Sequence, residues 1–402
     1  MEHYINNNVL FVLGKYNGAI YNFNTKHIFS LNHEATLCLS NYISTRSTAN
    51  PDEETFIKSL KLSCLLRDDE IIAANDKIDI DGSISFAWLE VTQSCNLRCL
   101  HCYEGSQHVR SNERLSKVEW QDIIKQLWDN GCRKIQFIGG EPTHYEHIIE
   151  LIDFAIGCGF DNISIFTNAT IISQQLLESL KTNNIKVHVS LYGHMPKIHD
   201  LITQKIGSFD KTIKNIQLMV SLGIAVDVAI TFMRENEDYY DEIITFVKKL
   251  GVKYYKHDII RGTSNNHIDV HCCTKKEVIS TKYKTSPRFI ADEHHYRIAK
   301  GYNTCWYGKI TVSETGDVFP CIFSRDIILG NLKHESMEVI MKSQQFQEVQ
   351  KLDFSKIEEC QYCEFRYACK DCRPLSISMN NKYAKNPRCL YNPTTGVWNS
   401  LK

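Results

Sequence analysis

This 402-residue sequence lacks several features that are typical of membrane, nucleic-acid-binding and secreted proteins. No apolar run approaches the roughly 20 residues that a membrane-spanning helix needs. The 46 Lys and Arg residues nearly balance the 47 Asp and Glu residues, so the chain lacks the positive charge of a nucleic-acid-binding protein. The N-terminal Met1-Glu2-His3 has no basic region like that of a secretory signal. We therefore expect a soluble, cytoplasmic protein with no nucleic-acid or membrane partner.

Cysteine, in contrast, is abundant, with 16 residues in the chain. Cytosolic reductants keep thiols reduced, so metal sites explain this number better than a disulfide framework does. The cysteines are unevenly spread. Three lie within residues 95–102, four lie within residues 360–372, and three more flank the second group at positions 305, 321 and 389. We assign most of the others to ordinary core packing.

Residues 1–83 predict a small α+β domain. Two short apolar runs flank Asn17-Gly18, which is a good hairpin turn. Two helices are expected next, one after the N-cap Asn32 and one that begins at Pro51. Strands, a helix pair and a returning wing resemble the winged-helix-like modules that bind a leader peptide by strand addition. A plain structural cap on the next domain is the alternative.

From residue 85 onward, strand and helix patterns alternate regularly. Helix starts are readable, for example from the capping box that Ser116 forms with Glu119. Successive strands joined by helices form a parallel sheet, so we expect a partial (β/α)6 TIM-like barrel with its chemistry at the carboxyl ends of the strands. The six expected strands span residues 85–91, 134–138, 163–167, 186–191, 224–231 and 252–260.

The domain boundaries follow from these changes of pattern. The barrel is expected over residues 84–262, a bridging region over 263–303, and a cysteine-rich domain over 304–402. The last domain has little apolar core of its own and is expected to fold around metal. The predicted fold class is therefore α/β, with a small α+β domain before the barrel.

The first cysteine group directly follows the first strand of the barrel. Cys95, Cys99 and Cys102 can hold one cubane iron–sulfur cluster and leave one iron without a protein ligand. An iron with an open position can bind a small chelating substrate, whereas a fourth cysteine would close the site. Three core cysteines on one helix face are the alternative, but Asn96 and Arg98 lie between them.

These residues resemble the signature of the radical SAM superfamily, Cys-x3-Cys-x-aromatic-Cys, with His101 at the aromatic position. The resemblance implies that a [4Fe-4S] cluster binds S-adenosylmethionine (SAM) through its amino and carboxylate groups. One electron then cleaves SAM to a 5′-deoxyadenosyl radical. The segment Gly139-Gly140-Glu141-Pro142, at the end of the next strand, resembles the family's GGEP segment, which holds the amino group of SAM.

Further SAM contacts are implied at the ends of the third and fourth strands. Asn168 follows the third strand, and Ser190 lies in a segment like the family's Ile-Ser-x-x-Gly, whose serine contacts SAM. Many relatives have an arginine some twelve residues further on. Here that stretch reads Leu201-Ile202-Thr203, so no carboxylate partner is identified. The resemblance covers roughly residues 85–262.

The second cysteine group resembles the SPASM extension of radical SAM peptide-modifying enzymes, although the spacing from Cys369 to Cys372 is one residue short. Zinc knuckles are the alternative, but they usually have many more residues between their cysteine pairs than the five found here. The resemblance implies two auxiliary [4Fe-4S] clusters. The implied ligands are Cys360, Cys363, Cys369 and Cys389 for the distal cluster, and Cys305, Cys321 and Cys372 for the proximal one.

The proximal cluster has only three implied ligands. Some relatives have a fourth cysteine six residues before the first of these ligands, where this chain has Ala299. We favour a site that is open to a substrate thiol, with Cys272 or Cys273 as alternative ligands.

The SPASM pattern beside a peptide-binding module points to a peptide substrate. The best resemblance is to maturases of ribosomally made peptides, including the grasp-with-SPASM systems. It implies hydrogen abstraction from a precursor peptide, a thioether or carbon–carbon crosslink, and a low-potential flavodoxin or ferredoxin as reductant. Sulfatase-type maturases, which oxidise Cys or Ser, have an acidic residue where this chain has Ile322. A non-enzymatic electron carrier or a zinc-binding module is the other alternative.

No catalytic base is identified from the sequence. Possible cavity residues are Asp258, Asp269, Tyr192 and His188.

Overall fold

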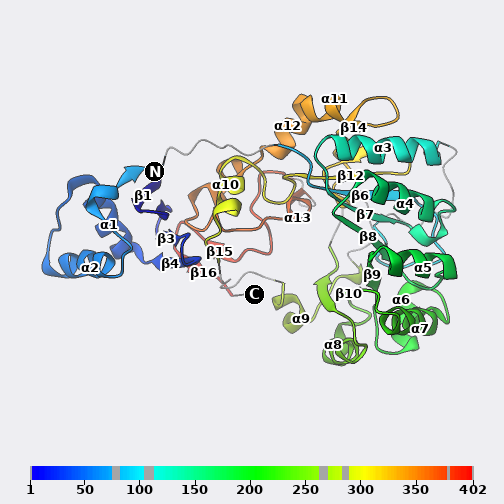
Figure 1. Ribbon diagram of the computed structural model, residues 1–402. Coiled ribbons are helices and arrows are strands. Elements are labelled where there is room, and N and C mark those ends of the chain that lie inside the picture. The colour runs from blue at the N-terminus through cyan, green and yellow to red at the C-terminus, as the bar shows by residue number, and fades with distance from the viewer. Residues whose placement is uncertain are drawn as a thin grey trace. The chain divides into compact units, whose positions relative to one another are not determined.

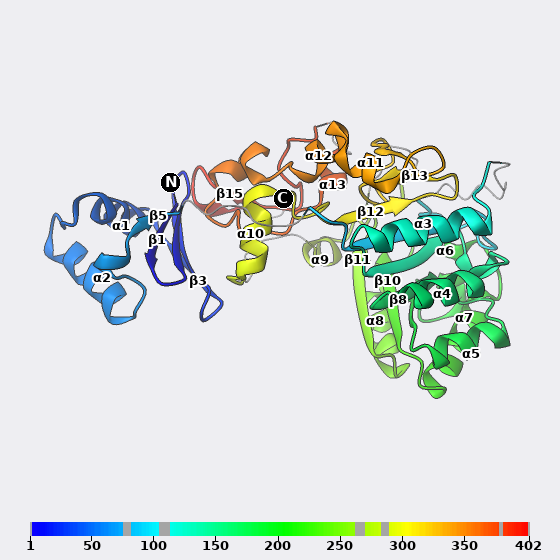
Figure 2. The ribbon, with the colours of Figure 1, turned by 45° about the horizontal axis from the view of Figure 1, so that its top comes forward.

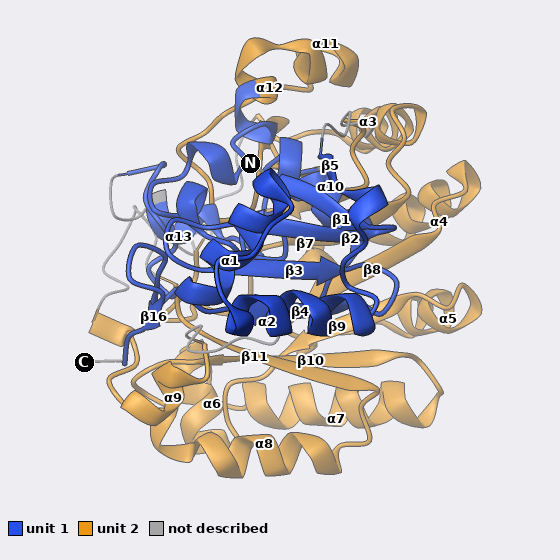
Figure 3. Ribbon diagram, turned by 90° about the vertical axis from the view of Figure 1, so that its left-hand side faces the viewer, with its two compact units in different colours: residues 1–81, 283–307, 348–402 blue, residues 82–282, 308–347 orange. Residues whose placement is uncertain are grey.

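A computed structural model of the chain describes residues 2–74, 82–103, 113–261, 270–282, 289–377 and 381–400. The chain divides into two compact units (Figure 3). Unit 1 consists of residues 1–81, 283–307 and 348–402, and unit 2 consists of residues 82–282 and 308–347. The predicted boundaries after residues 83, 262 and 303 remain predictions.

Unit 2 is built on a nine-stranded sheet in the order β11-β10-β9-β8-β7-β6-β12-β13-β14 (Figure 1). The six strands expected from the sequence are all present and run parallel to one another. They are β6 (Phe86–Thr92), β7 (Lys134–Gly139), β8 (Asn162–Thr167), β9 (Lys186–Ser190), β10 (Val226–Phe232) and β11 (Tyr254–Ile259). The partial-barrel prediction is confirmed.

Helices connect these strands and cover one side of the curved sheet (Figures 1 and 2). They are α3 (Lys117–Asp129), α4 (Ile148–Cys158), α5 (Gln174–Thr182), α6 (Pro196–Thr203), α7 (Ser208–Ser221) and α8 (Tyr240–Lys249), with short 3-10 turns η2 (Pro142–His144) and η3 (Glu237–Tyr239). The predicted capping box forms at the start of α3, where the Ser116 hydroxyl accepts from the Glu119 N–H. Across the described ranges, no helix has the length and apolar character to cross a membrane.

Strand β9 shows which side of the sheet is available for a site. Val187 and Val189 are fully buried, whereas Lys186, His188 and Ser190 are only half-buried. Successive side chains of a strand point to opposite faces. The two valines therefore pack toward the helices, and the three polar side chains line the face that the helices leave uncovered.

The sheet continues beyond the barrel into the C-terminal part of the chain. Strand β12 (Lys309–Val312) pairs in parallel with β6, and β13 (Asp317–Phe319) and β14 (Gly330–Asn331) extend the sheet in antiparallel fashion. The remaining helices here are α9 (Lys276–Ser280), α11 (Met337–Lys342) and α12 (Gln344–Gln350), the last of which crosses into unit 1. The sequence did not reveal this continuation.

Unit 1 contains a five-stranded antiparallel sheet in the order β4-β3-β2-β1-β5. Its strands are β1 (Glu2–Asn6), β2 (Val9–Leu13), β3 (Gly18–Asn22), β4 (His27–Leu31) and β5 (Ile72–Ala73). Helix α1 (His33–Thr45) begins after Asn32 and α2 (Pro51–Leu62) begins at Pro51, as expected. A 3-10 turn, η1 (Asp68–Glu70), leads to β5. The wing is expected over residues 71–80, and its part from residue 75 onward lies outside the described residues.

The sheet of unit 1 is buried on both faces. Phe11 and Ile20 lie on the face that packs against α1 and α2. Val12 and Tyr21 lie on the opposite face, in a core that includes Tyr391 of the C-terminal segment. That segment and the one before it form α10 (Glu293–Gly301), η5 (Phe354–Lys356), η6 (Cys360–Tyr362), α13 (Arg373–Ile377), β15 (Tyr391–Asn392) and β16 (Val397–Trp398). The N-terminal sheet therefore shares a hydrophobic core with the cysteine-rich segment.

Candidate functional site

The loop that carries the first cysteine group follows β6 at its carboxyl end. Backbone hydrogen bonds attach it to the end of α6, where the N–H groups of Arg98 and Leu100 donate to the carbonyls of Thr203 and Ile202 at 3.1 and 3.0 Å. This is the stretch in which many relatives have an arginine. In this chain its main chain fixes the position of the cysteine loop.

The three thiols of this loop lie within one another's electrostatic influence. Burial, with smaller contributions from Glu141 and Cys102, raises the pKa of Cys95 to about 11, although a hydrogen bond from the Leu97 N–H opposes the rise. Burial also raises the pKa of Cys99, with added contributions from Cys102 and Cys95. A bound metal centre would instead lower these pKa values, because its positive charge stabilises the thiolate form. Three partly buried, soft donors close enough to influence one another's pKa fit an iron–sulfur cluster.

Within the described ranges, no three His, Cys, Asp or Glu side chains are grouped closely enough to hold a single metal ion. Two thiolates on one zinc ion can be no more than about 4.6 Å apart, since each Zn–S bond is about 2.3 Å. The thiolates of a cluster bind different iron atoms and are further apart.

The two glycines of the Gly139-Gly140 segment allow the end of β7 to approach the start of the cysteine loop. Gly139 has φ +130°, and a Cβ there would lie 2.2 Å from the Thr92 carbonyl oxygen. A Cβ on Gly140 would lie 2.4 Å from the carbonyl oxygen of Gln93 and 2.5 Å from that of Ser94. The backbone that these glycines accommodate is therefore the chain leading to Cys95.

Glu141 is buried, and its carboxylate accepts hydrogen bonds from several donors. Its Oε1 accepts from the Thr143 N–H at 3.0 Å, the Thr143 hydroxyl at 2.8 Å and the Thr167 hydroxyl at 2.7 Å. Its Oε2 accepts from the Asn168 N–H at 2.7 Å. Burial raises the pKa of Glu141, and these hydrogen bonds oppose that rise. A carboxylate has about four lone-pair sites, so Oε2 can accept one more donor.

Asn168 contacts the cysteine loop itself. Its side-chain amide donates to Asn96 Oδ1 at 2.9 Å and approaches Cys95 Sγ at 3.9 Å. Asn96 in turn donates to the Thr170 hydroxyl at 2.7 Å. This network orients the first cysteine of the loop.

His101 lies beside Tyr192, which follows the end of β9. Their rings meet edge-to-face with centroids 4.6 Å apart, and the His101 Nδ1 is buried with no hydrogen-bond partner among the residues that the structure describes. Burial, assisted by His271, lowers the pKa of His101 to about 4, so its ring is neutral. Ser190 hydrogen-bonds to Tyr192. The structure thus brings these two predicted SAM contacts together around one tyrosine.

The other possible cavity residues have partners of their own. Asp258 pairs with Arg261 at 2.6 Å, and His188 lies 3.6 Å from Asp227. Tyr192 is part of the cluster with His101, and Asp269 lies outside the described residues. None of them is identified as a catalytic base.

The sequence analysis missed a buried ion pair on the uncovered face of the sheet. Glu90 of β6 is 1% exposed, and the Arg325 guanidinium donates to both of its carboxylate oxygens, at 2.8 Å to Oε2. Tyr103, next to Cys102, donates to the same carboxylate at 3.4 Å. Glu90 thereby joins the barrel, the first cysteine loop and the segment that follows Cys321. No local pattern could have indicated a partner 235 residues away.

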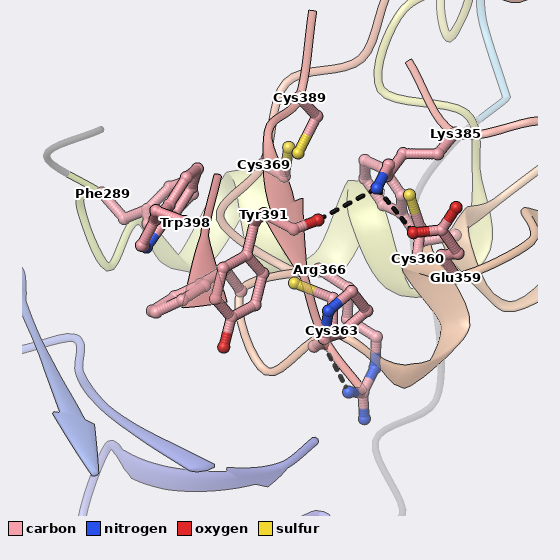
Figure 4. A pocket seen from close by; sticks show the side chains of 13 residues that line it. Phe289, Glu359, Cys360, Cys363, Arg366, Cys369, Lys385, Cys389, Tyr391 and Trp398 are labelled. Carbon is pink, nitrogen blue, oxygen red and sulfur yellow. Dashed lines mark hydrogen bonds and ion pairs between the residues drawn. The ribbon is translucent and has the colours of Figure 1, made fainter. Parts of the chain in front are cut away.

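The second cysteine group surrounds a pocket in unit 1. Figure 4 shows the sulfur atoms of Cys360, Cys363, Cys369 and Cys389 around this pocket. Aromatic side chains complete the wall, among them Phe289, Tyr391 and Trp398. Burial raises the pKa values of Cys360 and Cys363 well above the usual range, with Cys369 adding to both. All four implied distal ligands therefore meet at one pocket, which fits a cluster.

The structure tests the proximal group only in part. The main-chain N–H of Asp371 donates to the Thr304 hydroxyl at 3.1 Å, so the segments that carry Cys305 and Cys372 adjoin in unit 1. Cys321 belongs to unit 2, and the grouping of all three remains a prediction. The alternative ligands Cys272 and Cys273 also belong to unit 2, where Cys272 packs in the same hydrophobic cluster as Cys99.

Comparisons with known proteins agree with these features. Residues 89–247 match the radical SAM superfamily, and residues 305–364 match the SPASM iron–sulfur cluster-binding domain. The chain is 29% identical over 336 residues to the antilisterial bacteriocin subtilosin biosynthesis protein AlbA of Bacillus subtilis, covering 78% of this chain and 74% of AlbA. It is 25% identical over 354 residues to the AdoMet-dependent heme synthase of Oleidesulfovibrio alaskensis, covering 78% of this chain and 89% of that protein.

The fold is similar to that of SuiB from Streptococcus suis. The structure of SuiB bound to SAM superposes with a TM-score of 0.62 at 16% identity and covers 96% of this chain and 99% of SuiB. A structure of SuiB bound to its precursor peptide SuiA superposes with a TM-score of 0.59 at 16% identity, covering 96% of this chain and 98% of SuiB. At this identity the likeness concerns the fold.

Proposed function

Because the chain belongs to the radical SAM superfamily and carries a SPASM domain, we propose that it is a maturase that crosslinks a ribosomally made precursor peptide. The family makes it a SAM-dependent enzyme rather than an electron carrier or a zinc module. The observation that carries the peptide assignment is the N-terminal sheet of unit 1, which has an exposed edge strand, β4, and shares a core with the cysteine pocket. AlbA and SuiB, which are named for bacteriocin biosynthesis and for binding a precursor peptide, support the same assignment.

In this proposal Cys95, Cys99 and Cys102 hold a [4Fe-4S] cluster with one open iron. When bound, the cluster and SAM supply a 5′-deoxyadenosyl radical, which abstracts hydrogen from the peptide. Glu141 receives the amino group of SAM on Oε2, its remaining acceptor, and Gly139 and Gly140 set the position of Glu141 next to the loop. Ser190, His101 and Asn168 complete the set of SAM contacts.

The auxiliary clusters are assigned to the C-terminal cysteines. Cys360, Cys363, Cys369 and Cys389 hold the distal cluster, because they surround one pocket. The proximal cluster is assigned to the cysteines at positions 305, 321 and 372, with a site open to a substrate thiol. The proposed task of these clusters is to accept the electron that is left when a thioether or carbon–carbon bond forms. The electron for SAM cleavage would come from a flavodoxin or ferredoxin.

Strand addition at β4 is the proposed mode of peptide binding. This strand pairs on one side with β3 and has no strand on its other side among the described residues. Its side chains are mostly exposed, including Phe29 at 42%. An edge strand presents unpaired N–H and C=O groups, which an extended peptide can satisfy, and apolar side chains then select the sequence.

The test is anaerobic reconstitution with iron and sulfide, followed by reduction with SAM and a precursor peptide encoded beside this protein. We expect 5′-deoxyadenosine, methionine and a peptide that has lost hydrogens, as seen by mass spectrometry. Cys99→Ala should abolish SAM cleavage, and Cys363→Ala should reduce peptide crosslinking more than SAM cleavage. Cys158→Ala, on α4 and outside both groups, is the matched control and should change neither. SAM cleavage by the Cys99→Ala variant would contradict the cluster assignment, and an unmodified peptide would contradict the crosslinking function.

A further inference from the structure

A tyrosine of the N-terminal sheet contacts the loop that carries Cys363. Tyr21 lies on β3 and is 0% exposed. Its hydroxyl donates a buried hydrogen bond of 2.8 Å to the main-chain carbonyl oxygen of Glu364, the residue after Cys363. The partners are 343 positions apart in the sequence. The bond therefore joins the sheet directly to the wall of the cysteine pocket.

The same peptide group also contacts the thiol. The N–H of Phe365, which belongs to the peptide bond between Glu364 and Phe365, hydrogen-bonds to Cys363. One peptide group thus accepts from Tyr21 at its oxygen and donates to the Cys363 sulfur at its nitrogen. Hydrogen bonds in such a chain polarise one another, so the tyrosine strengthens the N–H donor that faces the sulfur.

Other contacts fix this loop against the sheet on both sides of Glu364. The Lys15 N–H donates to the Tyr362 carbonyl at 2.9 Å, and the Arg366 guanidinium donates to the Leu13 carbonyl at 3.1 Å. A Cβ on Gly14 would lie 2.8 Å from a carboxylate oxygen of Glu364, so the hairpin and the loop are in close contact. The residues on both sides of this peptide group are therefore held against the sheet by contacts that do not depend on Tyr21.

We propose that Tyr21 is a positioning residue of the distal cluster site, which holds the Glu364–Phe365 peptide group so that its N–H points at the Cys363 sulfur. This inference rests on the proposed cluster in that pocket. Hydrogen bonds to cluster sulfurs stabilise the more negative, reduced state and raise the reduction potential. The N-terminal sheet thereby tunes the distal cluster in addition to its proposed role in peptide binding.

The experiment compares Tyr21→Phe with the wild-type enzyme, both as full chains loaded with all clusters. Removing the hydroxyl should move the midpoint potential of the distal cluster to a more negative value in an EPR-monitored redox titration. The first cluster and the rate of SAM cleavage without peptide should not change. Tyr42→Phe is the matched control, because Tyr42 lies in the same N-terminal region and its hydroxyl bonds to Asp68 and Lys61 instead. It should leave the potential of the distal cluster unchanged.

A Tyr21→Phe enzyme that selectively loses the distal cluster, about four iron atoms per chain, would also support the positioning role. An unchanged distal potential at full iron content would overturn it. Loss of iron from every site would overturn it as well, because the bond would then support the whole fold rather than one cluster. Cys363→Ala distinguishes failure of the proposed role of Tyr21 from failure of the proposed distal cluster. If that variant keeps the full iron content and every EPR signal, the proposed distal cluster itself is wrong.

Discussion

Gly140→Ala is the substitution that examines the junction between β7 and the cysteine loop most directly. The added methyl group would lie 2.4 Å from the Gln93 carbonyl oxygen and 2.5 Å from the Ser94 carbonyl oxygen. Both neighbours are backbone atoms, so no side chain can rotate away. The loop must move, and it moves just before Cys95.

The magnitude follows from what this movement breaks. Overpacking a tight site costs about 1–3 kcal/mol. Two backbone hydrogen bonds cross the junction, from the Gly140 N–H to the Thr92 carbonyl at 2.7 Å and from the Glu141 N–H to the Ser94 carbonyl at 2.9 Å. Each contributes about 1 kcal/mol. We therefore expect Gly140→Ala to lower the free energy of unfolding by about 3–5 kcal/mol and to weaken SAM binding, because the loop that carries Cys95 moves.

Urea denaturation and SAM-cleavage assays on the purified variants provide the measurement. Gly157→Ala is the matched control, since Gly157 lies within α4 and a Cβ there meets nothing within 4 Å. It should stabilise the protein by about 0.5–1 kcal/mol, the usual gain from alanine in a helix. The reasoning is refuted if Gly140→Ala unfolds at the wild-type urea concentration and cleaves SAM at the wild-type rate.

Two further predictions concern buried polar groups of unit 2. Glu90→Gln should lower the free energy of unfolding by about 3 kcal/mol, the low end of the range for a broken buried ion pair, because the Arg325 side chain is 21% exposed. A double-mutant cycle with Arg325→Met checks this, and a coupling energy near zero would contradict it. His199 is buried, its Nδ1 accepts from the Tyr192 N–H at 3.3 Å, and burial lowers its pKa to about 4. Below pH 6.5 His199 therefore binds a proton in the unfolded chain but not in the folded chain. The free energy of unfolding should fall by up to about 3 kcal/mol between pH 6.5 and 4. His101 has a similarly lowered pKa and adds to the same loss, so His199→Asn should reduce the loss over this pH range without abolishing it. An unchanged profile would contradict the role of His199.

Much of the barrel could be predicted because its signals are local. The strands of unit 2 are apolar runs at regular spacing, and a capping box such as Ser116 with Glu119 is complete within four residues. The helix starts at Asn32 and Pro51 were equally local. Strand β12 was missed, since its four residues become a strand only by pairing with β6, more than 200 residues earlier in the chain.

In the candidate site, too, some residues could be predicted from the sequence and others could not. The grouping of Cys360, Cys363, Cys369 and Cys389 could be predicted because the resemblance supplied the cysteine pattern, and the structure brings the four side chains to one pocket. The supporting groups could not be predicted. In the sequence Glu90 looks like any polar residue of a strand, and Tyr21 looks like any aromatic residue of a core. Their roles depend on Arg325 and on the Glu364 carbonyl, which are distant in the sequence.

The central claim is that three cysteines leave one iron of the first cluster open to SAM. Pulsed ENDOR spectroscopy of the reduced enzyme with SAM labelled with 15N at its amino group tests it most directly. We expect a nitrogen hyperfine coupling that reports direct binding to iron and that is absent from the Cys99→Ala variant. A reduced cluster that is unaffected by labelled SAM, with four protein thiolates around it, would contradict the claim.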